Sequence, residues 1–99
     1  MADFLKIEDF QPHVGKIVSF VGTPFAFPLD RIMSKHQQIP YGSSRIPFTL
    51  IFVGPKSPRY LPEGQYDCAI AGGPTFSGIH VNPIHTPEPD RQEYQAVFN

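Results

Sequence analysis

Histidine is the side chain in this sequence best suited to acid–base chemistry or metal binding, and the chain has four of them. His80 and His85 are five residues apart, and an odd offset on a strand places two side chains on opposite faces. The sequence has neither an HxH nor an HExxH spacing. A metal site would therefore need His13 or His36 to approach from elsewhere, together with a carboxylate. We predict no metal site and no cofactor, and interpret the histidines as surface or loop residues.

The single cysteine, Cys68, is the other candidate for chemistry. It cannot form an internal disulfide, which favours a reducing, cytosolic setting. A histidine base would make it a nucleophile. However, it lies between Asp67 and Ala69 in a segment where it alternates with Tyr66 and Ile70, and no basic neighbour is present to lower its pKa. We interpret Cys68 as a small buried hydrophobic residue and predict no catalytic residues.

Other patterns associated with catalysis are weak. Glu88 and Asp90 lie in a proline-rich segment, where ionised carboxylates are normally solvated. The glycine-containing segments 54–57 and 72–75 do not have the spacing of a phosphate-binding loop, and neither precedes a predicted helix. Both are typical of hairpin turns. We therefore predict that the protein is not an enzyme.

Aromatic residues in predicted loops are the remaining candidates for a binding site. Tyr41, Tyr60 and Phe76 fall in such segments, and aromatic loop residues on a rigid β scaffold are common contact residues. These three are our candidate ligand-binding residues. The alternative is that their rings close the open ends of the fold, because aromatic rings are usually buried.

Proline governs which elements can position these residues. The chain has twelve prolines among 99 residues, and a proline inside a helix costs about 3 kcal/mol. Long helices are therefore excluded. The one helical candidate is Ile7–His13, which Pro12 limits to a short turn. We expect this turn to pack Phe10 and Val14 onto a sheet.

Alternating apolar residues predict about six strands separated by turn signals. Apolar residues on both faces of Ile46–Val53 indicate a central strand, whereas Pro28 makes its segment an edge strand or marks a bulge. Short strands at this spacing favour an all-β fold, a small antiparallel barrel or sandwich with one N-terminal helical turn, in a single domain over residues 1–99. The predicted strands are Lys16–Val21, Phe25–Lys35, Ile46–Val53, Gln65–Ile70, Ser77–Ile84 and Glu93–Phe98.

Charge and hydropathy exclude further classes of function. Eight basic and nine acidic residues leave a net charge of −1, so we expect no binding of nucleic acid. The longest apolar stretch, Leu50–Val53, is too short to span a membrane. Charged residues interrupt Met1–Phe10, so no signal peptide is predicted. We expect a cytoplasmic protein without membrane contact.

Four motifs in order resemble a known family. They are Ile7–Phe10 with His13 and Gly15, Pro47–Phe52 with Gly54 and Pro55, Leu61–Tyr66, and the ending Tyr94–Asn99. This set resembles DUF6916, a family of small bacterial proteins of unknown function. The resemblance covers nearly the whole chain and implies no activity, and no functional residues carry over from it. It implies at most a structural or assembly role, tied to phage-tail-like gene clusters.

These observations leave three functional hypotheses. The leading one is a non-enzymatic protein-binding or assembly module, in which Glu93–Asn99 forms an edge strand whose Tyr94 and Phe98 meet a partner or a second copy. The alternative is a small-ligand or carbohydrate binder that uses Tyr41, Tyr60 and Phe76. The third is a metal-dependent enzyme built on His80 or His85.

Overall fold

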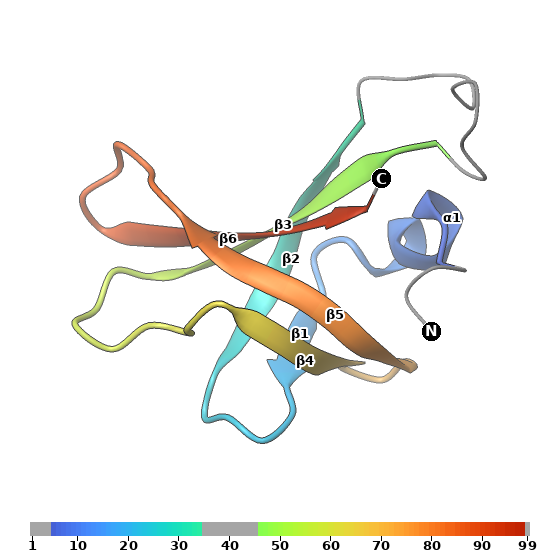
Figure 1. The fold of residues 1–99 in the computed structure, drawn as a ribbon, viewed down its shortest axis with the longest axis horizontal. Helices are drawn as coiled ribbons and strands as arrows, with labels where there is room; N and C mark the ends of the chain where they lie inside the picture. Colours follow the sequence, from blue (N-terminus) through green and yellow to red (C-terminus); the bar gives the residue numbers. More distant parts are fainter. Residues whose placement is uncertain (1–4, 35–45, 99) are drawn as a thin grey trace.

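Six antiparallel strands close into a barrel in the described parts of the chain, residues 5–34 and 46–98 of a computed structural model (Figure 1). The predicted all-β class is confirmed, and of the two predicted architectures the barrel is correct. The elements are α1 (Ile7–Phe10), η2 (Gln11–His13), β1 (Ile17–Phe20), β2 (Ala26–Met33), β3 (Phe48–Pro55), β4 (Gly64–Ile70), β5 (Thr75–Ile84) and β6 (Arg91–Phe98).

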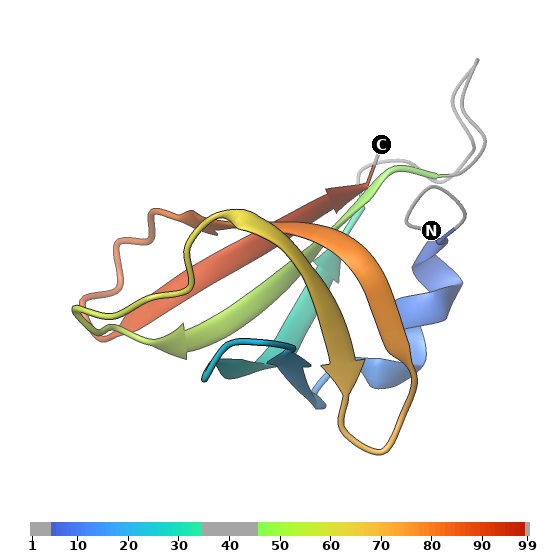
Figure 2. The same cartoon turned by 60° about the horizontal axis from the view of Figure 1, so that its bottom comes forward.

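The barrel follows the order β1-β2-β3-β6-β5-β4. Strands β1, β2 and β3 are consecutive neighbours, and β4 returns to lie beside β1, which is a Greek-key connection. Two strands change partners along their length. Strand β2 pairs first with β1 and then with β3, while β5 pairs first with β4 and then with β6. Strands β2 and β5 therefore belong to both halves of the barrel (Figure 2). One half is β2-β1-β4-β5, and the other is β2-β3-β6-β5.

Pro28 lies where β2 changes partners. The backbone N–H of Leu29 donates to the carbonyl of Lys16 at 2.9 Å, so the nitrogen of Pro28 points away from β1, toward the side of β3. Pairing with β3 begins only at Leu29, and its register shifts between Leu29 and Arg31. The proline therefore removes no bond from the β1 ladder. The prediction of an edge strand is wrong, and the irregularity that we gave as its alternative falls just beyond the proline.

The N-terminal turn fills a gap in the barrel wall. Strands β5 and β6 pair only over three residues each, so the start of β5 and the end of β6 are not paired with each other. The ring of Phe10 is buried there. Its centroid lies 4.6 Å from the ring centroid of Phe76 on β5 and 5.5 Å from that of Phe98 on β6. The predicted packing of Phe10 is confirmed.

Val14 does not join Phe10 in the core and is 44% exposed, so that part of the prediction is wrong. Residues four apart share a face of an α-helix. Here, however, the chain tightens into a 3₁₀ turn over Gln11–His13, with Pro12 within it. Three residues per turn move Val14 off the face of Phe10.

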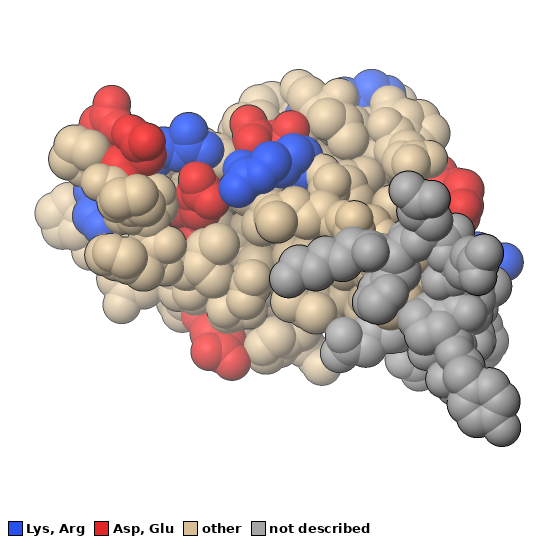
Figure 3. All heavy atoms as spheres, turned by 90° about the horizontal axis from the view of Figure 1, so that it is seen from above, with Lys and Arg blue, Asp and Glu red and all other residues tan. Residues whose placement is uncertain are grey.

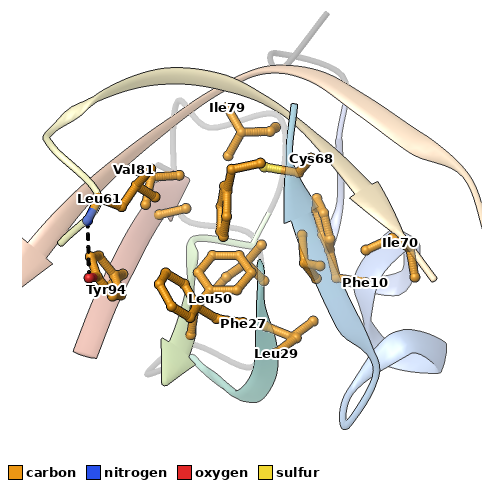
Figure 4. Close-up of a cluster of buried hydrophobic side chains, with 14 of the residues drawn as sticks. Phe10, Phe27, Leu29, Leu50, Leu61, Cys68, Ile70, Ile79, Val81 and Tyr94 are labelled. Atoms are coloured by element: carbon orange, nitrogen blue, oxygen red, sulfur yellow. Dashed lines mark hydrogen bonds between the residues drawn. The ribbon is translucent and has the colours of Figure 1, made fainter. Parts of the chain in front are cut away.

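The core is the alternating inward face of the strands (Figure 4). Phe48, Leu50 and Phe52 of β3 are buried, as predicted for a central strand. Tyr94 on β6 stacks on Phe27 on β2, with ring centroids 4.8 Å apart and planes 12° from parallel. The ring of Phe27 occupies the space where a Cβ of residue 54 would lie, so Gly54 is required for this stack.

We predict that Gly54→Ala destabilises the protein by about 1–3 kcal/mol, because the added methyl group overlaps the ring of Phe27 and forces the stack apart. Urea unfolding measures this loss. Gly64→Ala in β4 is the matched control, since a Cβ there meets the Tyr66 side chain at an ordinary 3.5 Å. Equal stability of the two variants would contradict the placement of Phe27.

Candidate functional site

The aromatic residues predicted to bind a ligand do not form one site in the described residues. Tyr41 lies outside them. Tyr60 is 54% exposed in the β3–β4 connection. Phe76 lies in β5 rather than in a loop, half-buried against Phe10. Figures 1 and 2 place the β3–β4 connection and the β4–β5 turn at opposite ends of the molecule. Tyr60 and Phe76 therefore cannot stack on one small ligand.

The predicted partner edge at Tyr94 and Phe98 is not an edge in this fold. Strand β6 pairs with β3 along its whole length and with β5 over Glu93–Gln95. Both aromatic rings point into the core, where Tyr94 stacks on Phe27 and Phe98 stacks on Phe48. The prediction of an edge strand is wrong for Tyr94, where β6 is paired on both sides. Beyond Gln95 the side of β6 away from β3 is not paired with β5, but the side chain of Phe98 is buried and cannot meet a partner.

Two histidines of the described residues make polar contacts with side chains of other types. His80 Nε2 is 3.1 Å from Glu63 Oε2, and His13 Nδ1 is 3.4 Å from Lys16 Nζ. Between residues 5–34 and 46–98, no three His, Cys, Asp or Glu side chains gather as metal ligands would. His36 lies outside the described residues.

Between residues 5–34 and 46–98, the only α-helix is the short α1, and no helix there could span a membrane.

Cys68 is buried in the core beside Ile70 and Ile79, as predicted for a small hydrophobic residue. Burial, with a smaller contribution from the charge of Asp67, raises the pKa of the Cys68 thiol from 9.0 to about 12. The thiol is therefore protonated at neutral pH and is a poor nucleophile.

A shallow groove of about 480 Å³ runs over the outside of β2, β3 and β6. Two cross-strand rows form its centre, because Thr49 pairs with Met33 and Val97, and Ile51 pairs with Arg31 and Gln95. Directly paired residues share a face of a sheet. We call this surface the outer groove and define it by Arg31, Met33, Thr49, Ile51, Gln95 and Val97.

Apolar side chains are arranged at two depths in the outer groove. Ile51 is only 2% exposed, although it lies outside the core cluster, because Arg31 and Gln95 flank it. Met33 and Val97 are 45% and 48% exposed. The groove thus has a covered apolar floor and two apolar side chains open to solvent.

Ion pairs border the outer groove at Glu93. Its Oε1 accepts a hydrogen bond from Arg31 at 3.3 Å, and its Oε2 is 2.9 Å from Nη2 of Arg91. Arg31 also donates to Asp30 at 2.9 Å. In Figure 3, which views the molecule from above Figure 1, positive and negative side chains lie next to each other. The charges therefore fix side chains at the rim and do not form a field of one sign.

The residues of the outer groove were not predicted from the sequence, although a signal for them exists. Apolar residues on both faces of the central strand identified Ile51 as facing away from Leu50 and Phe52. A strand that is apolar on its outer face needs a cover there. Its neighbours Met33 and Val97 could be found only once the strand order and register were known.

We predict that Cys68 reacts with iodoacetamide at least about a hundredfold more slowly in the native protein than in the urea-unfolded chain, at roughly pH 9. The reason is that the buried thiol keeps its proton and is shielded. Mass spectrometry measures both rates. Similar rates in the two states would contradict the burial of Cys68.

The same shift makes stability depend on pH. Between 9.0 and about 12 the unfolded chain loses the thiol proton while the folded protein keeps it. The free energy of unfolding should therefore fall with rising pH over this window, and fall less in Cys68→Ala. Parallel profiles for the two proteins would contradict the raised pKa.

Comparison with known proteins agrees with the order of motifs noted in the sequence. The family model Domain of unknown function (DUF6916) matches residues 5–98, which is nearly the whole chain. Searches of curated proteins and of solved structures found no match to this chain. The matched range includes α1 and all six strands of the barrel. The chain therefore belongs to the DUF6916 family.

Proposed function

We propose that this protein is a non-enzymatic protein-binding module, and that its partner docks on the outer groove. The observation that carries the proposal is the row Met33–Thr49–Val97, in which two large apolar side chains are about half exposed on neighbouring positions of three paired strands. Apolar side chains gathered in this way over a groove are typical of a protein contact surface.

The groove suits a partner that presents an apolar side chain between polar groups. Such a side chain would fit between Met33 and Val97, and the flexible thioether of Met33 can adapt to its shape. Thr49 and Gln95 supply hydrogen-bonding groups beside it. The ion pairs of Glu93 lie at the border, which matches the usual arrangement of an apolar centre with a charged rim.

Binding is favoured over catalysis by the state of the single thiol. Cys68 is the residue that a thiol-based mechanism would use, and burial keeps it protonated. The partner is a second copy of this chain or another protein of a larger assembly. An assembly role in phage-tail-like gene clusters stays a prediction from the family resemblance.

We predict that the double variant Met33→Lys/Val97→Lys binds its partner at least about tenfold more weakly than the wild type, because two charges must then be buried at the centre of the contact. Binding is measured by recovering a partner from lysate, identifying it, and titrating the purified pair by calorimetry. Light scattering over a range of concentrations tests self-association.

The matched control is Ile17→Lys/Val21→Lys. These side chains are also large, apolar and about half exposed, but they belong to β1 and its following turn. The control should bind like the wild type, and both double variants should unfold at similar urea concentrations. Equal loss of binding in the two variants, or a wild-type monomer that retains no partner, would count against the proposal.

A further inference from the structure

A second cavity lies at the end of the barrel where β2, β3 and β6 meet the β3–β4 connection. Its volume of about 250 Å³ is just below the range of about 300–1,000 Å³ common for ligand sites, so it suits a small molecule. Its walls combine aromatic rings with prolines, and one cation lies at it. We call it the barrel-end pocket and define it by Phe25, Phe27, Pro55, Ser57, Arg59 and Tyr94.

The aromatic side of the barrel-end pocket is held rigidly. Phe27 is buried between Gly54 and the stacked ring of Tyr94, so its ring has little freedom. The ring centroid of Phe25 lies 5.8 Å from that of Phe27, and Phe25 is half-buried. The Oγ1 of Thr23 accepts the backbone N–H of Phe25 at 3.1 Å and donates to the carbonyl of Phe20 at 2.7 Å. These two hydrogen bonds hold the backbone at Phe25 and so fix the direction of its side chain.

The opposite wall is a loop tied down at several points. The N–H of Lys56 donates to the carbonyl of Asp90 at 3.2 Å, and the N–H of Arg59 donates to Ser57 Oγ at 3.2 Å. At its far end, the N–H of buried Leu61 donates to the hydroxyl of Tyr94 at 3.2 Å (Figure 4). The pocket therefore exists before any ligand arrives, which lowers the entropy cost of binding.

Arg59 supplies the charge among the residues that line the barrel-end pocket. Among the described residues, the ion pairs are made by Arg31, Arg91 and His80, and Arg59 has no carboxylate partner. A guanidinium beside aromatic rings presents paired N–H donors that match the two oxygens of a carboxylate. A single cation in a small apolar pocket fits a monoanion better than a phosphate dianion.

We propose that the barrel-end pocket binds a small aromatic carboxylic acid. The planar ring of the ligand lies against the half-buried ring of Phe25, and its carboxylate pairs with Arg59. This site is separate from the outer groove and does not depend on the proposed function, because only β2, β3 and β6 as a scaffold are common to both.

Indole-3-acetate is a suitable probe, because the chain has no tryptophan and the indole fluorescence is then free of tryptophan background. We expect saturable binding with a Kd below about 1 mM. Arg59→Gln should weaken binding by at least about tenfold, since the charge-assisted pair is lost. The neutral analogue indole-3-acetamide should bind the wild type about as weakly as indole-3-acetate binds Arg59→Gln.

Lys56→Gln is the matched control, because it removes a neighbouring charge that does not line the pocket. It should bind indole-3-acetate like the wild type, as should Met33→Lys/Val97→Lys in the outer groove. Phe25→Ala should also weaken binding, and its half-buried ring makes the folded state tolerant of the change. Amide NMR shifts should concentrate at residues 24–27 and 55–59.

Three results would overturn the proposal. The first is no saturable binding of indole-3-acetate. The second is equal affinity of wild type and Arg59→Gln, or of acid and amide. The third is NMR shifts concentrated away from the pocket. Loss of partner binding in Met33→Lys/Val97→Lys with intact ligand binding would separate this inference from the proposed function.

Discussion

The ring of Phe27 lies where the side chain of residue 54 would be and stacks on Tyr94, and this contact positions much of the molecule. It joins β2, β3 and β6 at one end of the barrel, and it is available only because residue 54 is glycine. The hydroxyl of Tyr94 then accepts the N–H of Leu61, which fastens the β3–β4 connection to the core. One aromatic stack therefore sets both the end of the barrel and the path of the loop that crosses it.

Closure of the barrel decides how the protein can bind others. In an open sheet, the alternating strand at the C-terminus would offer backbone N–H and C=O groups to a partner. Here β6 is paired with β3 along its whole length, and its aromatic side chains are in the core. The outer side chains of β2, β3 and β6 remain for contact. Strand β3 contributes to both the core and the contact surface. Leu50 and Phe52 fill the core, while Thr49 and Ile51 form part of the outer groove.

Local pattern predicted the parts of this structure that depend on neighbours in sequence. Alternation located each strand to within a few residues, but it did not show that Tyr94 and Phe98 on β6 are buried. Burial of Phe10 and Cys68 was predicted. The errors arise where one element ends and another begins. A 3₁₀ turn moved Val14 out of the core. Strand β2 changes partners at Pro28, so it is paired on both sides of the barrel wall and is not the predicted edge strand.

The sequence by itself determined the all-β class and membership in the DUF6916 family, because twelve prolines exclude long helices and the order of motifs is visible without a structure. Only the tertiary structure decided where binding surfaces lie. The pairing of β2 and β6 with β3 brings Met33 near Val97. The path of the β3–β4 connection places Arg59 at the same pocket as Phe27. A pattern of period two gives the face of each residue within its strand, but not which strand lies beside it or whether the sheet closes.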